Sequence, residues 1–248
     1  ITWEDTVTIP AYLYPLSLNW ELSNVPLYEG NTYTVKDLYE ASLISSANAA
    51  VIALSYHVSG SEEAFVAKMK EKLESIGITD ATVVNASGLN NSYLGENYVP
   101  GTPADGENYL SAKDIAILAR HLLTDYPEIL ETTKIPTATF GANTSLPYEM
   151  VNWNWMLPGL VNYKEGVDGL KTGTTDIAGA CFVGTMEKDG HRMITVVQHA
   201  NDHENNASAR FIETNKLMDY VLNNWQLTTV DPTTFALPKK HLNVQYGK

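Results

Sequence analysis

A lysine, a threonine and a glycine follow one another at positions 171–173, within the stretch VDGLKTGTTDIAG (167–179). A strand with these residues presents an ammonium group, hydroxyls and accessible backbone N–H groups together, an array that suits a substrate carboxylate. The glycines allow an extended substrate to approach the strand backbone closely. The tripeptide alone is weak information because three residues recur by chance, and an exposed lysine on an edge strand is the structural alternative.

A second polar group lies in SSANAA (45–50), where Ser46 and Asn48 are two positions apart at the predicted start of a helix. A hydroxyl can relay a proton, and an amide can hold a peptide bond. Both side chains could therefore serve one cleft. The alternative is that they cap the helix, because Ser and Asn are favoured at cap positions.

Two predicted helices would position these residues. Residues 34–44 begin with Thr34 and Asp37 at the spacing of a capping box and continue with apolar residues at helical intervals. Residues 48–58 are apolar almost all round, so this helix must be buried. Together they predict a helical lobe that holds Ser46 and Asn48.

The lysine motif precedes two strand-like runs, at 179–187 and 192–200, joined by the hairpin signal Asp189–Gly190. Helical patterns occupy 111–127, which opens with the capping-box sequence SAKD, and 207–225. We therefore predict a mixed α/β (α+β) fold in which helices cover both faces of an antiparallel sheet. The site would lie between the helical lobe and the edge of this sheet.

Two other segments have a different character. Residues 80–110 are rich in Asn, Gly, Pro and Tyr and have no periodicity. They are predicted to be a loop, and a loop of this length in a compact domain usually has a function. Residues 227–248 change to short strand-like pieces. We expect one main domain over residues 1–226 and the start of a β-rich module over 227–248.

Composition excludes several classes of protein. The formal net charge of −13 argues against nucleic-acid binding, which requires clustered Lys and Arg. No uninterrupted apolar run reaches the roughly 18 residues that a membrane span requires.

His199 and His203 have a spacing compatible with zinc on a helix, but they follow a strand and are predicted to lie in a loop. We expect neither a metal site nor a cofactor.

The order of the motifs adds specificity. Ser-x-Asn, followed about 120 residues later by Lys-Thr-Gly with SAKD between them, resembles the penicillin-recognising serine enzymes. Within that group the sequence is most similar to the low-molecular-mass penicillin-binding proteins, the D-alanyl-D-alanine carboxypeptidases of Gram-positive bacteria. The likeness extends over roughly residues 25–225 and is carried by YTVKDLYEASLISSANAAVIAL, SAKDIAILARHLLTDYPEILE and VDGLKTGTTDIAGACFVGT. It implies a β-lactamase/transpeptidase-like domain.

The resemblance also implies how a substrate is bound. Lys171, Thr172, Gly173 and Thr174 would form the site for the terminal carboxylate of a peptidoglycan stem peptide ending in D-Ala-D-Ala, or for that of a β-lactam antibiotic. Arg210 could add a second positive charge, although it begins a helix and a surface role is equally compatible with the sequence.

Catalytic roles are implied for Ser46, Asn48 and Lys171, and for one backbone N–H group. Ser46 would pass a proton towards the leaving amine, and Asn48 would hold the substrate amide. The backbone N–H of Thr174 would form an oxyanion hole together with that of an acylated serine. The product would be a stem peptide shortened by one D-Ala.

One departure from the family pattern is important. Members of the family carry a Ser-x-x-Lys tetrad whose serine is acylated, and no serine of this sequence has a lysine three positions later. In the family the tetrad lies upstream of Ser-x-Asn. We therefore expect the nucleophile before Ile1, which makes the present sequence a domain truncated at its N-terminus.

Two alternative functions remain open. A serine β-lactamase needs a group for deacylation, and Glu96 is present without the expected surroundings. A protein without the nucleophile would instead be a peptidoglycan-binding pseudoenzyme. The family likeness implies an extracytoplasmic location at the cell membrane or cell wall, with membrane attachment only through a C-terminal anchor outside this sequence.

Overall fold

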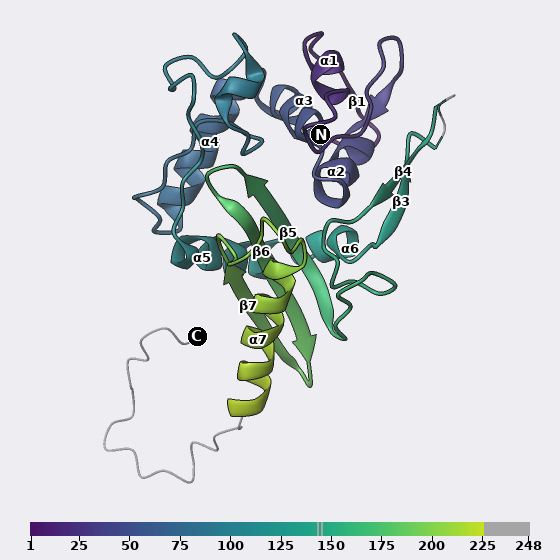
Figure 1. The fold of residues 1–248 in the computed structure, drawn as a ribbon. Helices are drawn as coiled ribbons and strands as arrows, with labels where there is room; N and C mark the ends of the chain where they lie inside the picture. The colour runs from purple at the N-terminus through teal and green to yellow at the C-terminus, as the bar shows by residue number, and fades with distance from the viewer. Residues whose placement is uncertain (143, 145, 226–248) are drawn as a thin grey trace, which may run out of the picture.

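The computed structural model describes residues 1–142, 144 and 146–225. Its centre is a three-stranded antiparallel sheet in the order β5-β6-β7, formed by β5 (Val167–Thr175), β6 (Gly179–Lys188) and β7 (His191–Val197) (Figure 1). The predicted sheet is confirmed, and β5 adds the lysine motif to it. The β-rich module expected over 227–248 lies outside the described residues.

The hairpin between β6 and β7 has the predicted turn. Asp189 and Gly190 have φ values of 53° and 75°, so both residues are in the left-handed region. This is the backbone of a type I′ turn, whose twist matches that of the flanking strands. Lys188 pairs with His191 directly beyond it.

Helices cover both faces of the sheet, as predicted. In Figure 1, α7 (Ala209–Asn224) lies in front of the sheet, and α5 (Ala112–Asp125) and α6 (Ile129–Thr133) lie behind it. The front layer is held by aromatic packing, since the fully buried Phe182 of β6 contacts Phe211 of α7 edge to face, with ring centroids 5.2 Å apart. Burial of such a ring contributes roughly 2–3 kcal/mol through the hydrophobic effect.

The second part of the molecule is the helical lobe, built around α1 (Leu13–Ser17), α2 (Val35–Ile44) and α3 (Asn48–Ser59). Thr34 and Asp37 form the predicted capping box at the start of α2. Several side chains of α3 are completely buried, as its apolar sequence required. The lobe also contains two short antiparallel ladders: β1 (Thr6–Val7) with β2 (Tyr33–Thr34), and β3 (Thr137–Phe140) with β4 (Tyr148–Val151).

A third packing unit links lobe and sheet. Helix α4 (Glu62–Ser75) packs against α3, and its apolar side shares a small core with α5. The following residues, 80–110, contain only the 3₁₀ turn η1 (Asn91–Leu94) and one isolated bridge between Thr82 and Tyr109. We call this segment the Asn-rich loop. It is irregular, as predicted, and it returns to the sheet.

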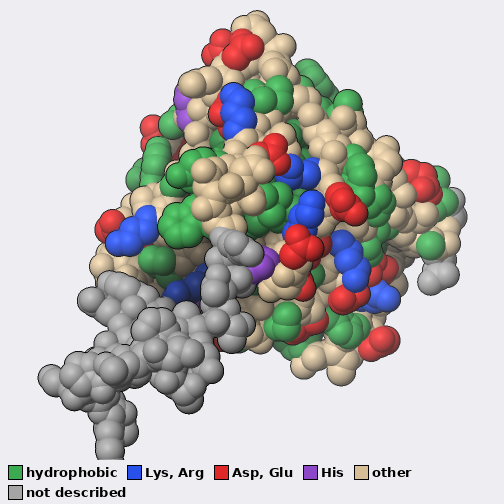
Figure 2. All heavy atoms as spheres, turned by 90° about the horizontal axis from the view of Figure 1, so that it is seen from below, with side chains coloured by type: hydrophobic (Ala, Val, Ile, Leu, Met, Phe, Trp, Pro, Cys, Tyr) green, Lys and Arg blue, Asp and Glu red, His purple; other side chains and the backbone are tan. Residues whose placement is uncertain are grey.

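The surface has no dominant charge of one sign on the face that Figure 2 shows. Acidic and basic side chains are interspersed there, so the net charge of −13 is not gathered into one patch on that face. None of the helices in the described ranges is both long enough and apolar enough to cross a bilayer.

Candidate active site

The site lies where β5 faces the helical lobe. Within the described residues β5 is an outer strand of its sheet, with β6 as its ladder partner. Lys171 in the middle of β5 donates a hydrogen bond of 2.7 Å from Nζ to Oγ of Ser46, a residue 125 positions earlier. The fold therefore brings together the two motifs that the sequence analysis singled out.

Lys171 is a cation in a confined environment. Besides Ser46, its Nζ donates to the backbone carbonyl of Thr172 at 3.0 Å. Burial, and secondarily the positive charge of Arg210, lower the pKa of Lys171 to about 8. No carboxylate of the described residues forms an ion pair with Lys171. A partly buried cation without an anion is unfavourable, and binding an anionic ligand would relieve that cost.

Ser46 has an uncommon backbone conformation. It lies between α2 and α3 with a φ of 57°, in the left-handed region that residues other than glycine rarely adopt. The hydrogen bonds from Ser45 N and Ala47 N to the carbonyl of Ala41, both 3.1 Å, hold this turn in place. Local strain of this kind is concentrated at functional sites. Here it aims the hydroxyl of Ser46 at Lys171.

Neither Ser46 nor Asn48 caps helix α3 through its side chain. Ala47 occupies the N-cap of α3, and no side chain caps this end. Asn48 is almost fully buried, and both its backbone N and its Nδ2 donate to the carbonyl of Ser23, at 3.0 and 2.9 Å. Asn48 therefore ties the start of α3 to the segment around Ser23. It forms no hydrogen bond with Lys171 or Ser46 in the described part of the chain.

Arg210 is not a plain surface residue. From the first turn of α7 it crosses the end of the sheet and donates to the carbonyls of Gly173 and Cys181, at 2.9 and 3.1 Å, and to Oγ1 of Thr174 at 2.8 Å. Burial lowers the pKa of Arg210, which nevertheless stays protonated. Like Lys171, it has no carboxylate partner within the part of the chain that the structure describes.

The remaining motif residues lie along β5. Lys171, Thr172, Gly173 and Thr174 pair with Val183, Phe182, Cys181 and Ala180 of β6. Gly173 is exposed, and a Cβ added to it would meet no atom within 4 Å. Open space above a strand glycine is what close approach by an extended ligand requires.

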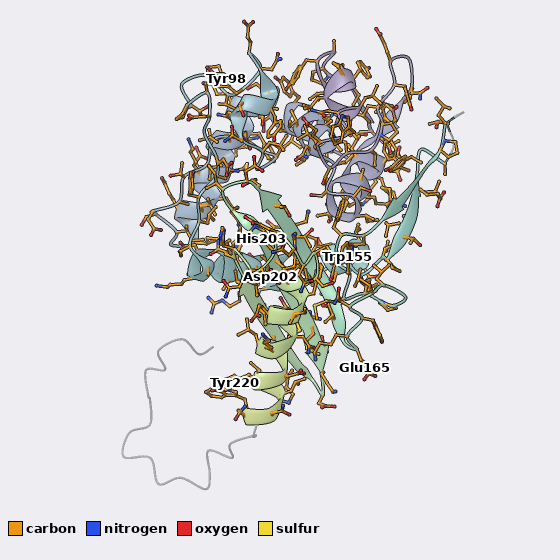
Figure 3. The ribbon with its side chains drawn as sticks, viewed as in Figure 1. Tyr98, Trp155, Glu165, Asp202, His203 and Tyr220 are labelled. Carbon is orange, nitrogen blue, oxygen red and sulfur yellow. The ribbon has the colours of Figure 1, made fainter. Side chains whose placement is uncertain are left out.

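The histidines form no metal site in the described residues, which hold no group of three or more His, Cys, Asp or Glu side chains placed for an ion. His199 and His203 lie in a loop, as predicted, and their rings are 5.0 Å apart at the centroids. Nδ1 of each lies within hydrogen-bond distance of a backbone carbonyl, Ala178 O at 3.2 Å and Ala200 O at 2.8 Å. His203 and the adjacent Asp202 precede α7, beside the sheet (Figure 3).

Two more residues lie next to the site. Trp153 donates from Nε1 to the carbonyl of Ser45 at 3.1 Å and remains 46% exposed, so its ring borders the turn that carries Ser46. Glu107 of the Asn-rich loop accepts a hydrogen bond from Thr175 at the end of β5. The sequence carries no signal for either contact, because each joins residues far apart in the chain. Glu96, in contrast, is exposed.

An antiparallel sheet between helices, with Lys-Thr-Gly on its outer strand facing Ser-x-Asn in a helical lobe, defines a penicillin-binding protein or β-lactamase-like transpeptidase fold. Solved structures agree. A peptidoglycan synthesis regulatory factor (PBP3) from Streptococcus pneumoniae is 50% identical with a TM-score of 0.84, over 90% of this chain and 60% of that one. Penicillin-binding protein D2 from Listeria monocytogenes, solved with ampicillin, is 32% identical with a TM-score of 0.68, over 88% and 77%.

Residues 1–202 match the family described as D-alanyl-D-alanine carboxypeptidase, peptidase family S11, and the chain belongs to this family. D-alanyl-D-alanine carboxypeptidase DacF of Bacillus subtilis is 31% identical over 205 residues, which cover 82% of this chain and 46% of that protein. DacC of Escherichia coli is 30% identical over 194 residues, 78% of this chain and 42% of that protein. The chain thus spans about half the length of the curated relatives it matches.

Proposed function

We propose that this protein is a serine-type D-alanyl-D-alanine carboxypeptidase, which removes the terminal D-Ala from peptidoglycan stem peptides through an acyl-enzyme and is acylated by β-lactams. The observation that carries the proposal is the pair of cations at β5. Lys171 in the middle of an outer strand and Arg210 at Gly173 and Thr174 of the same strand have no neutralising carboxylate among the described residues. A substrate that ends in a carboxylate supplies the missing charge.

Binding would use the strand and its side chains. Lys171 and the hydroxyls of Thr172 and Thr174 hold the terminal carboxylate, and Arg210 adds a second positive charge next to Thr174. The space above Gly173 receives the substrate backbone. Because both β-lactams and D-Ala-D-Ala peptides carry a carboxylate near the scissile bond, one site serves both.

Chemistry would follow in two steps. The serine of a Ser-x-x-Lys tetrad gives its proton to the lysine of the tetrad, attacks the peptide carbonyl and becomes acylated as the bond to the terminal D-Ala breaks. The 248 residues contain no such tetrad, so we place this serine outside them. The oxyanion is stabilised by the backbone N–H of Thr174 together with that of the acylated serine. The Oγ of Ser46 accepts from Lys171, so the hydroxyl hydrogen of Ser46 is not used in that bond. Ser46 donates this proton to the leaving amine of D-Ala. Water then releases the shortened peptide.

Asn48 keeps polar groups available for the substrate. One of the two Nδ2 hydrogens bonds to the carbonyl of Ser23, which leaves the other hydrogen and Oδ1 to hold the substrate amide. We further propose that the protein acts outside the cytoplasm, at the cell membrane or cell wall, where stem peptides are found.

The test is covalent labelling by a fluorescent penicillin, followed by mass spectrometry of the intact protein, together with release of D-Ala from a stem pentapeptide. Both are measured on the complete gene product and on the 248-residue chain. We expect a slowly hydrolysed adduct and D-Ala release from the complete product alone. Rapid turnover of the adduct would make the protein a β-lactamase, and a complete, folded product without adduct would make it a binding protein.

A further inference from the structure

The Asn-rich loop reaches the end of β5 through one buried carboxylate. Glu107 is only 5% exposed. Its Oε2 accepts from Oγ1 of Thr175 at 2.9 Å, and its Oε1 accepts from Nδ2 of Asn90 at 3.2 Å. Thr175 is the last residue of β5, one position beyond Thr174. A buried carboxylate is costly unless it is hydrogen-bonded, so this contact joins two segments 68 residues apart under a strong constraint.

Both neighbours of Glu107 are fixed within the loop. The carbonyl of Gly106 accepts from Asn91 N at 2.9 Å. Asn108 accepts from Val84 N at 2.7 Å through Oδ1 and donates to the carbonyl of Asn85 at 3.0 Å through Nδ2. Glu107 is thus held on both sides along the chain.

Buried amides extend this framework. Asn85 and Asn91 are completely buried and bond to each other, Nδ2 to Oδ1, at 2.8 Å. Asn91 also donates to Thr102 Oγ1 and to the carbonyl of Pro103, at 2.9 and 2.7 Å. Although the Asn-rich loop has no periodic structure, it is therefore rigid around Glu107, because side chains form hydrogen bonds with its backbone groups.

Thr175 also forms a hydrogen bond with the turn after β5. Its Oγ1 donates to Glu107 and accepts from Ala178 N at 3.0 Å, immediately before β6 begins at Gly179. On the other side, Arg210 holds the preceding residues Gly173 and Thr174. The end of β5 is therefore held by hydrogen bonds from two sides, from Arg210 of α7 and from Glu107 of the Asn-rich loop. In Figure 1 this loop lies beside the end of the sheet where β5 turns into β6.

We infer that Glu107 is a positioning residue for the carboxylate site: it fixes Thr175, and through it the strand end that presents Thr174 and its backbone N–H. The inference rests on the proposed function. Two donors, the Thr175 hydroxyl and the Asn90 amide, converge on this side chain. A carboxylate accepts from both, whereas a glutamine offers one acceptor oxygen and one donor nitrogen. Small displacements of a binding group are expensive in catalysis.

The experiment compares Glu107→Ala, Glu107→Gln, Thr175→Val and Thr175→Ser in the complete gene product. We expect kcat/KM for a D-Ala-D-Ala peptide, and the acylation rate by penicillin, to fall about tenfold for Glu107→Ala and Thr175→Val, the range of one lost charge-assisted hydrogen bond. Glu107→Gln falls less, and Thr175→Ser keeps wild-type rates because it retains the hydroxyl. The double variant Glu107→Ala/Thr175→Val loses no more than either single one.

Glu62→Gln is the matched control. Glu62 is 3% exposed and accepts from Ala86 N of the same loop at 2.9 Å, but it has no hydrogen bond to β5. It should keep wild-type kcat/KM. Thermal unfolding of every variant separates loss of the fold from loss of position. Amide hydrogen exchange at Ala178, which accelerates when Thr175 is released, reports on the contact without any reaction.

The possible failures differ. An active wild type whose Glu107→Ala and Thr175→Val variants stay within twofold in kcat/KM, or fall no more than Glu62→Gln does, overturns the role of Glu107 and leaves the proposed function intact. A folded wild type that neither takes up penicillin nor releases D-Ala overturns the proposed function, and this role falls with it. In that case exchange at Ala178 still decides whether Glu107 restrains the strand end.

Discussion

Lys171 and Ser46 meet across the boundary between sheet and lobe, with Nζ donating to Oγ over 2.7 Å. The lysine is confined enough that its pKa is lowered to about 8. A hydroxyl that accepts from a cation is a better proton donor to a third group. The same lysine can therefore attract a carboxylate and assist the proton that Ser46 is proposed to deliver.

Two substitutions of Ser46 separate its hydroxyl from its backbone. Ser46→Ala and Ser46→Gly both remove the hydroxyl, and we expect each to lower the acylation rate about 10²- to 10⁴-fold, the usual range for a lost proton-transfer group. Because Ser46 has a φ of 57°, the glycine variant should be about 1 kcal/mol more stable than the alanine variant. Urea unfolding and penicillin acylation kinetics measure the two effects. Unequal activities of the two variants would point to the backbone instead.

Gly173→Ala tests whether the space above β5 belongs to the substrate. The added methyl group meets no atom within 4 Å, and the residue is not in the left-handed region, so stability should stay equal or rise slightly. A substrate that lies against the strand would meet the methyl group, and we expect KM for the peptide to rise at least about tenfold. Gly184→Ala is the contrasting control. Its methyl group would come within 3.0 Å of Thr195, Phe182 and Thr214, so it should destabilise the fold.

Much of this architecture follows from local patterns. The capping boxes at Thr34 and Ser111 begin helices where expected, and Asp189–Gly190 forms the expected turn. These signals are readable because the residues that interact are neighbours in sequence. The pairing of Ser-x-Asn with Lys-Thr-Gly came from the order of motifs in a known family, since no local pattern brings residues 46 and 171 together.

What could not be read has a common cause. Arg210 looked as much like a surface residue as a site residue, and its bonds to Gly173 and Thr174 depend on how α7 crosses the sheet. The contact of Glu107 with Thr175 depends on the path of an aperiodic loop. In both cases the role of the side chain depends on how distant segments pack together, and neither local sequence patterns nor composition indicate that packing.

The lowered pKa of Lys171 predicts how activity depends on pH. Carboxylate binding needs the protonated lysine, so kcat/KM, which reports on the free enzyme, should fall as pH rises through about 8. Lys171→Arg keeps its charge and should show no such fall between pH 7 and 9, whatever its absolute rate. Steady-state kinetics in a three-component buffer provides the comparison. A wild-type profile that is flat to pH 10 would contradict the assignment.

Stability should respond to the same group with the opposite sign. The folded-state pKa of about 8 is below the ordinary lysine value of 10.5, so between these values the unfolded chain holds more protons and wild-type stability rises with pH relative to a neutral variant. Lys171→Met removes the cost of confining a cation and should be at least as stable as wild type at pH 7, while losing about 10- to 100-fold in kcat/KM. Its advantage should shrink towards pH 10, as measured by urea midpoints. A variant that is less stable at pH 7 would indicate a structural role.

Arg210 is expected to matter for geometry as well as charge. Arg210→Ala leaves the carbonyls of Gly173 and Cys181 without their donor and removes a positive charge from the site, so KM for the peptide should rise about 10- to 100-fold. Arg210→Lys keeps the charge but not the planar fork that spans two carbonyls and Thr174 Oγ1, and should recover only part of this loss. Arg192→Ala is the matched control on the same sheet, because Arg192 is already neutralised by Asp168 and Glu187, at 2.8 and 2.9 Å. Equal losses for Arg210→Ala and Arg192→Ala would show that removing any arginine from this sheet disturbs it, and that Arg210 has no particular part in holding the carboxylate.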